Sequence, residues 1–237
     1  MQSFFSSRTK FRHFWILIIL ASLMSCQKEK KEEVTEVVRS PVTCAPVITD
    51  REWYNSDNKA PLFDGMGDLN FPISTDNELV QRYFNQGLVL AYGFNHAEAA
   101  RSFYYASKLD PECAMALWGY AYVLGPNYNA GMESDNYERA YEAIQRALKL
   151  SETNVTEKER DLILALSKRY VEEPVEDRSS LDVAYSEQMK ILFEKYPEDP
   201  DVSTLYAESI MNLHPWDLYE TSGELKPWTP NVLKALE

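Results

Sequence analysis

The stretch of sequence that decides the fold is VQRYFNQGLVLAYGFNHAEAARSFYYASKLDPEC, residues 80–113. Two apolar runs of helical length lie on either side of the dipeptide Gly93-Phe94, so the stretch predicts two helices joined by a short turn. Small residues at Gly87 and Ala99 allow the two helices to approach closely, and Phe103 fills the space between neighbouring helix pairs. The stretch therefore predicts a helical hairpin that packs against further hairpins.

The spacing of these residues resembles the tetratricopeptide repeat (TPR), a helix-turn-helix unit of about 34 residues. The positions that match the repeat without a gap are Gly87, Ala99, Phe103, Ala106 and Pro111. In the family, the first helix of each unit lines a concave groove. The resemblance implies the same arrangement here.

Weaker matches to the repeat follow along the chain. A second unit has Ala121 on its first helix and Ala140 on its second, with seven extra residues inserted around 125–131. A third unit sets Ala165 against Ala184, and a fourth begins near residue 207. Because one helix pair cannot cover its own apolar face, a continuous core needs at least three stacked units. We therefore expect an all-α, TPR-like solenoid of about three and a half helix pairs over residues 75–237.

Capping residues and prolines predict the helix boundaries. Thr75 with Glu78, and Asn95 with Glu98, have capping-box spacing, which places helix starts near residues 76 and 96. Pro111 is expected at the first position of the next helix, which Gly125-Pro126 ends. Further helices are expected at residues 135–150, 157–173, 178–195 and 201–211. Residues 51–74 carry no helical pattern and are expected to form an irregular lead-in.

The first 25 residues have the pattern of a bacterial secretion signal. Three cationic residues precede an apolar run at residues 14–23, which is short for a membrane span. The sequence LMSC at residues 23–26 resembles the lipobox, which implies cleavage before Cys26 and lipidation of that cysteine. An ordinary signal peptide with a cysteine nearby is the alternative. Glutamine at position 27 favours the outer membrane by the same resemblance, although the face of the membrane stays open.

Residues 26–50 are expected to be a flexible tether. The run QKEKKEE at 27–33 is entirely polar, and prolines follow it without helical periodicity. The run also resembles the export tags of some surface lipoproteins, but a solvated tether explains it. Cys44 and Cys113 lie 69 residues apart, in a compartment that permits disulfides. A small buried thiol is the expected state of Cys113, and whether the two cysteines meet stays open.

Composition excludes several classes of function. Of the 237 residues, 45% are apolar and 26% are charged, as in globular proteins. Lys plus Arg number 24 against 37 Asp plus Glu, so the formal charge is −13. Loss of residues 1–25 removes three cationic residues and no anionic one, which leaves −16. Nucleic acid is therefore not an expected partner.

A closer resemblance covers residues 60–220. The strings FNQGL (84–88), DPECAMALWG (110–119), GPNYN (125–129) and HPWD (214–217) resemble a bacterial TPR lipoprotein family of uncharacterised function. Members of that family are longer and contain further repeats with several histidines. The resemblance implies that this chain is an N-terminal fragment.

Candidate binding residues follow from the expected groove. Its inward positions are Phe84, Leu88, Tyr92, Trp118, Tyr122, Leu162, Leu166 and Tyr170. An aromatic groove suits an extended peptide or a partner helix. The alternative is that these rings merely pack between helices.

Polar residues at expected turns are a second candidate group. Asn95, His96 and Asn127 could bind a ligand, or they could stabilise the turns, with Asn95 as an N-cap. His214 has the same two interpretations. No metal spacing, phosphate loop or nucleophile motif accompanies them, so neither a catalytic residue nor a cofactor is predicted.

Three hypotheses remain. The first is a lipid-anchored module that binds a protein or peptide at the bacterial cell envelope. The second is an enzyme or carrier that depends on a metal or small ligand and whose site is partly supplied by residues beyond Glu237. The third is a structural envelope scaffold without a groove ligand.

Overall fold

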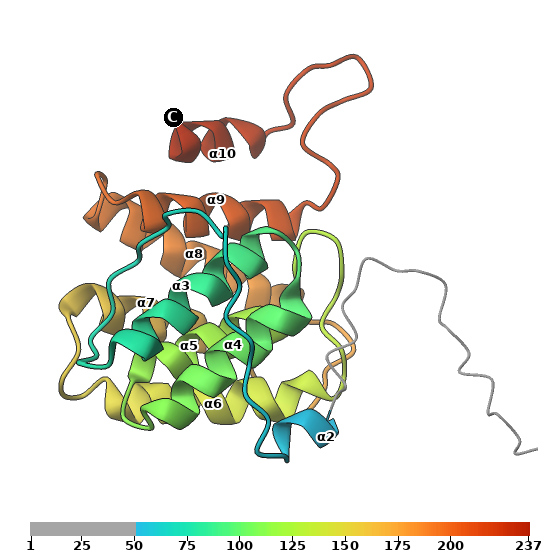
Figure 1. Cartoon of the computed structure of the whole chain (residues 1–237). Coiled ribbons are helices and arrows are strands. Elements are labelled where there is room, and N and C mark those ends of the chain that lie inside the picture. Colours follow the sequence, from blue (N-terminus) through green and yellow to red (C-terminus); the bar gives the residue numbers. More distant parts are fainter. Residues whose placement is uncertain (1–50) are drawn as a thin grey trace, which may run out of the picture. The chain divides into compact units, whose positions relative to one another are not determined.

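The computed structural model of this chain describes residues 51–237, and these residues are helical with irregular connections (Figure 1). Two isolated bridges, Asn127 with Ala130 and Tyr219 with Leu225, are the β-type pairings in this part of the chain. The helices are α2 (Arg51–Tyr54), α3 (Glu78–Tyr92), α4 (His96–Leu109), α5 (Ala114–Leu124), α6 (Asn136–Leu150), α7 (Glu157–Ser167), α8 (Ser179–Lys195), α9 (Pro200–Leu213) and α10 (Thr229–Leu236).

Helices that are neighbours in sequence pack against each other from α3 to α10. The first helices of successive pairs are also in contact, α3 with α5 and α5 with α7. Contacts of this kind are those of stacked helix pairs. The all-α prediction is confirmed for residues 51–237, and the packing is consistent with a helical repeat.

Phe103 on α4 lies between two glycines on neighbouring helices. A Cβ atom added to Gly87 on α3 would lie 2.6 Å from Cζ of Phe103, and one added to Gly119 on α5 would lie 2.3 Å from its Cδ1. The ring is fully buried. Gly87 therefore allows the close approach of α3 and α4, and Phe103 fills the space between helix pairs, as predicted. Gly119 also packs against Phe103, which the sequence pattern did not indicate.

The helix α2 was not predicted, since residues 51–74 were expected to be irregular throughout. The rest of the lead-in before α3 is irregular, and side-chain amides of α3 bind its backbone. Gln86 accepts from the Phe63 amide at 2.8 Å and donates to the Pro61 carbonyl at 2.9 Å. Gln81 accepts from the Ile73 amide at 3.0 Å and donates to the Phe71 carbonyl at 2.8 Å. These amides provide the hydrogen bonds that an extended segment without a partner strand otherwise lacks.

Glu159 on α7 fixes the end of the lead-in. Its carboxylate is buried and accepts from the backbone amide of Ser74 at 2.6 Å and from that of Thr156 at 2.7 Å. The hydroxyls of the same two residues also donate to it. Four donors surround one carboxylate, so its charge is well compensated.

Several helix boundaries differ from their predictions. Helix α3 is capped by Asn77, whose Oδ1 accepts from the Leu79 amide, and Thr75 instead donates to Asp110 at 2.7 Å. Thr75 is therefore not the helix cap, and α3 begins at Glu78 rather than at the expected residue 76. Pro111 lies in a turn closed by the Cys113 amide and the Asp110 carbonyl, and α5 begins only at Ala114. Helix α7 ends at Ser167 rather than at residue 173.

Other boundaries are confirmed. Asn95 caps α4 and accepts from the Glu98 amide, and Gly125 ends α5. The Cys113 thiol at the start of α5 is buried and free, and burial raises its pKa to about 11, so it stays protonated at neutral pH. The signal peptide, Cys26, the tether and Cys44 lie outside the described residues.

None of the helices within residues 51–237 combines the length and the apolar character that crossing a bilayer requires.

Candidate functional site

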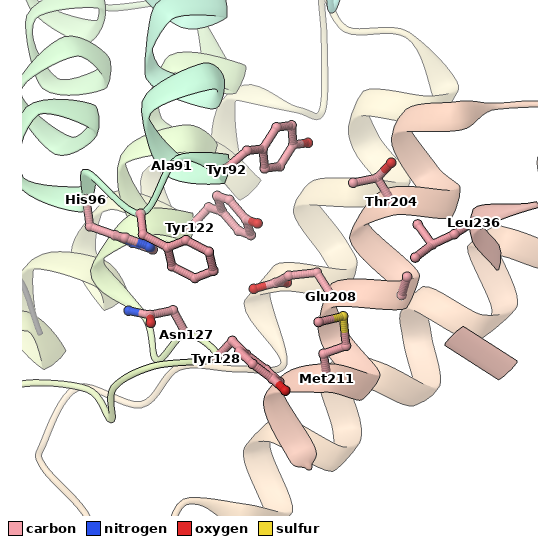
Figure 2. Close-up of a pocket in the computed structure, with 12 residues that line it drawn as sticks. Ala91, Tyr92, His96, Tyr122, Asn127, Tyr128, Thr204, Glu208, Met211 and Leu236 are labelled. Carbon is pink, nitrogen blue, oxygen red and sulfur yellow. The ribbon is translucent and has the colours of Figure 1, made fainter. Parts of the chain in front are cut away.

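A pocket of about 210 Å³ lies between the α3–α4 turn, α5 and α9 (Figure 2). Most of its surface is apolar or aromatic. Its lining residues are Ala91, Tyr92, Phe94, His96, Tyr122, Asn127, Tyr128, Thr204, Ala207, Glu208, Met211 and Leu236. Four parts of the chain that are distant in sequence therefore contribute to one cavity.

The turn between α3 and α4 brings two of these residues to the pocket wall. Phe94 has a positive φ of 59°, and the amide of Asn95 donates to the Leu90 carbonyl at 2.8 Å. Positive φ is uncommon for a residue with a bulky side chain. This tight turn puts His96 at the first position of α4, next to the C-terminal end of α3 that carries Tyr92.

The inserted loop after α5 contributes Asn127 and Tyr128. Asn127 and Ala130 exchange two backbone hydrogen bonds of 2.9 and 3.1 Å, and the Asn127 side chain accepts from the Asn129 amide at 2.8 Å. The loop begins at Gly125, where an added Cβ would lie 2.4 Å from the hydroxyl of Tyr170. That hydroxyl donates to the Ala121 carbonyl at 2.6 Å, so a side chain at position 125 would disturb this contact.

His96 is 7% exposed, and among the described residues neither of its ring nitrogens makes a hydrogen bond of regular geometry, although the Val123 carbonyl lies close enough to act on the ring. Burial lowers the pKa of His96, and the Arg169 guanidinium adds to this effect, while the Val123 carbonyl opposes it. The imidazole is therefore neutral near pH 7. A neutral imidazole offers one hydrogen-bond donor and one acceptor.

Glu208 on α9 faces these residues across the pocket. Its Oε1 accepts a hydrogen bond from Asn212, whereas Oε2 is shielded from water and has no partner within residues 51–237. Desolvation raises the pKa of Glu208, and Arg169 partly offsets the rise. Figure 2 shows its carboxyl group pointing from α9 toward Tyr122 and His96.

Two tyrosines complete the polar part of the pocket. The hydroxyl of Tyr92 is buried and, among the described residues, without a hydrogen-bond partner. Desolvation raises the pKa of both Tyr92 and Tyr122, and the charge of Glu208 raises both further. The ring of Tyr122 stacks on that of Trp118, with centroids 5.3 Å apart and an angle of 2° between the planes.

Behind the pocket lies a buried guanidinium. Arg169 is 1% exposed, donates to Asp182 at 3.1 Å and to the Pro126 carbonyl at 3.1 Å, and lies over the ring of Tyr185. Arg178 binds the same Asp182 carboxylate at 3.0 Å. Asp182 and the Pro126 carbonyl bind Nε and Nη2 of Arg169, whereas its buried Nη1 has no hydrogen-bond partner among the described residues, and its charge acts on Glu208.

The predicted groove residues divide into two sets. Tyr92 and Tyr122 line the pocket. The other six are in the core: Phe84, Leu88, Trp118, Leu162, Leu166 and Tyr170. Phe84 and Leu88 are 0% exposed and Trp118 is 1% exposed, so the alternative interpretation, packing between helices, describes this second set. A partner cannot reach these side chains without rearrangement of the core.

The polar candidates also divide. His96 and Asn127 line the pocket, whereas Asn95 is an exposed N-cap, the turn-stabilising role that was its alternative. His214 ends α9, where its ring stacks on Trp228 at 3.7 Å. Glu208, Thr204 and Tyr128 were not anticipated. The seven-residue insertion was the available signal for Tyr128, and no sequence pattern indicated Glu208.

Within residues 51–237, no group of three or more His, Cys, Asp or Glu side chains is placed to hold a metal ion. Comparison with protein-family models, with curated proteins and with solved structures finds no match for this chain.

Proposed function

We propose that this chain is a lipid-anchored, TPR-like module that binds a protein or peptide segment at the bacterial cell envelope, with the pocket between α3, α5 and α9 as its recognition site. The observation that carries the proposal is the set of buried polar atoms without partners inside one cavity, on Tyr92, His96 and Glu208. Buried polar groups are normally hydrogen-bonded, so several orphaned ones around a cavity are typical of a ligand site.

The helical-repeat packing supports a binding role. Stacked helix pairs offer extended surfaces for peptide segments, and the order of small and aromatic residues from Gly87 to Pro111 follows the TPR spacing. The lipobox at residues 23–26 supports attachment to the outer membrane through Cys26. A lipidated cysteine carries more than one acyl chain, which is enough for stable anchoring.

The anchor is tested by fractionation of cells that express the Cys26→Ala variant. We expect the variant in the soluble envelope fraction and the wild type in the membrane fraction. If the variant stays with the membranes, the lipid anchor is refuted.

The binding role is tested by co-purification of the full chain from membranes in mild detergent. Tyr92→Ala and Glu208→Gln should each lose the partner. The matched control is Glu187→Gln, which removes an exposed carboxylate on α8 and should keep it. Retention of every co-purified protein by both pocket variants would refute the pocket as the recognition site.

The limited size of the cavity favours a second candidate, a carrier of a small ligand. About 210 Å³ accommodates one side chain or one small molecule. Native mass spectrometry of the purified full chain distinguishes the two, because a carrier would retain a bound small molecule that is lost in Glu208→Gln.

A further inference from the structure

We infer that the pocket recognises a primary alkylammonium group, with Glu208 as its counter-charge and lysine of a bound peptide as its source. This inference rests on the proposed binding function and names the chemistry that the site selects. Free aliphatic amines carry the same group and are the alternative source.

The unpartnered atoms of the pocket match an ammonium because each of the three side chains that carry them offers a hydrogen-bond acceptor. Oε2 of Glu208, the hydroxyl of Tyr92 and one nitrogen of neutral His96 are without partners among the described residues. An ammonium group has three donors and no acceptor. Figure 2 shows these side chains on opposite walls of the same cavity, on α9 and on the α3–α4 side.

The charge of the lining also favours a cation. Glu208 is the one carboxylate in the lining, which contains no Lys or Arg. Arg169, whose charge acts on Glu208, is not among the lining residues, and its guanidinium donates to Asp182 at 3.1 Å and to the Pro126 carbonyl. Residues 51–237 contain 17 Lys and Arg against 32 Asp and Glu, a formal charge of −15, so the long-range field attracts cations as well.

The rest of the pocket suits the chain that carries the ammonium. Ala91, Ala207, Met211 and Leu236 provide an apolar wall that can cover methylene groups. Tyr122 and Tyr128 add aromatic rings, which attract a desolvated cation. A lysine side chain has this combination of an apolar stem and a cationic end.

The first arm of the test uses small probes. n-Butylamine reproduces the lysine side chain, and n-butanol has the same length without the charge. Calorimetric titration of the full chain in mild detergent should show butylamine binding at least tenfold tighter than butanol. Glu208→Gln should remove this preference, whereas the control Glu187→Gln should keep it. Equal binding of the two probes, no binding of butylamine, or an unchanged preference in Glu208→Gln would overturn the inference.

A second variant guards against misfolding. Tyr92→Phe keeps the ring and removes one acceptor, so it should weaken butylamine binding severalfold and leave butanol binding unchanged. Thermal unfolding of each variant shows whether it is folded. If Tyr92→Phe and Glu208→Gln are both folded and both bind butylamine as the wild type does, the assignment of the pocket is wrong.

The second arm uses the blocked peptides Ac-AAKAA-NH2 and its norleucine counterpart. Tighter binding of the lysine peptide, lost in Glu208→Gln, supports the inference together with the proposed function. Equal binding of the two peptides overturns the inference and leaves the binding function standing. Binding of butylamine without binding of either peptide supports the ammonium site but refutes a lysine peptide as its source.

Discussion

Replacing Gly119 by alanine should destabilise the protein, although alanine is normally the better helix residue. The added Cβ would lie 2.3 Å from Cδ1 and 2.4 Å from Cε1 of Phe103, far inside the usual carbon contact distance of about 3.5–4.0 Å. The ring has little room to withdraw, because Gly87 is packed against its Cζ end and the side chain is fully buried.

The magnitude follows from two opposing effects. Overpacking a core costs about 1–3 kcal/mol, and the closeness of this contact places the cost near 3 kcal/mol. Exchange of glycine for alanine inside a helix stabilises by about 1 kcal/mol. Gly119→Ala should therefore lower the free energy of unfolding by about 2 kcal/mol.

Urea denaturation followed by circular dichroism measures this change. In a Phe103→Leu background the clash is relieved, so Gly119→Ala should there be neutral or stabilising by up to about 1 kcal/mol, which gives a coupling of about 2–3 kcal/mol. The matched control is Gly131→Ala, where an added Cβ meets nothing within 4 Å. An equal effect of Gly119→Ala in both backgrounds, or a stabilised Gly119→Ala single variant, would refute the packing argument.

Three further changes test the buried polar groups. Glu208→Gln should stabilise the ligand-free protein at pH 7, because the raised pKa of Glu208 makes its ionisation destabilising as pH rises above about 4.5. In urea denaturation from pH 4.5 to 8, the difference in unfolding free energy between variant and wild type should widen with pH, and a constant difference would contradict this. The lowered pKa of His96 makes its protonation unfavourable in the folded state, so the wild type should lose stability as pH falls below about 6.5. His96→Gln should lose less unfolding free energy over the same pH range, and a pH profile identical to that of the wild type would contradict this. Glu159→Gln should lower the free energy of unfolding by about 3 kcal/mol, because the Glu159 carboxylate accepts from four donors on Ser74 and Thr156. The variant should also expose residues 60–74 to limited proteolysis, and protease resistance equal to that of the wild type would contradict this role of Glu159.

The fold was largely predictable because its signals are local. Helix periodicity, the Asn95 cap and the spacing of Gly87 and Phe103 lie within one repeat, where sequence distance and spatial distance agree. The error at Thr75 arose because its hydroxyl donates to Asp110 instead of capping α3. Pro111 lies in a turn that precedes α5, and a proline is suited to either position. Hydrogen bonds from Gln86 to the lead-in follow no periodic pattern, so no sequence rule predicts them.

The site was only partly predictable. Tyr92, Tyr122 and His96 stood out as aromatic or polar residues at expected inner faces and turns, but the sequence assigned them to two separate groups. Their position around one cavity depends on α9, which is distant from α3 and α5 in the sequence and contributes Glu208 to the lining. Trp118 carried the same aromatic signal and is buried in the core, since periodicity alone does not distinguish a groove from a helix interface.

The claim that peptide binding and amine binding use one site is tested most directly by competition. A fluorescently labelled lysine pentapeptide is bound to the full chain, and n-butylamine is titrated in while anisotropy is followed. We expect complete displacement by butylamine and none by equal concentrations of butanol. A peptide that stays bound at saturating butylamine would show that the pocket with Glu208 is not where the peptide is recognised.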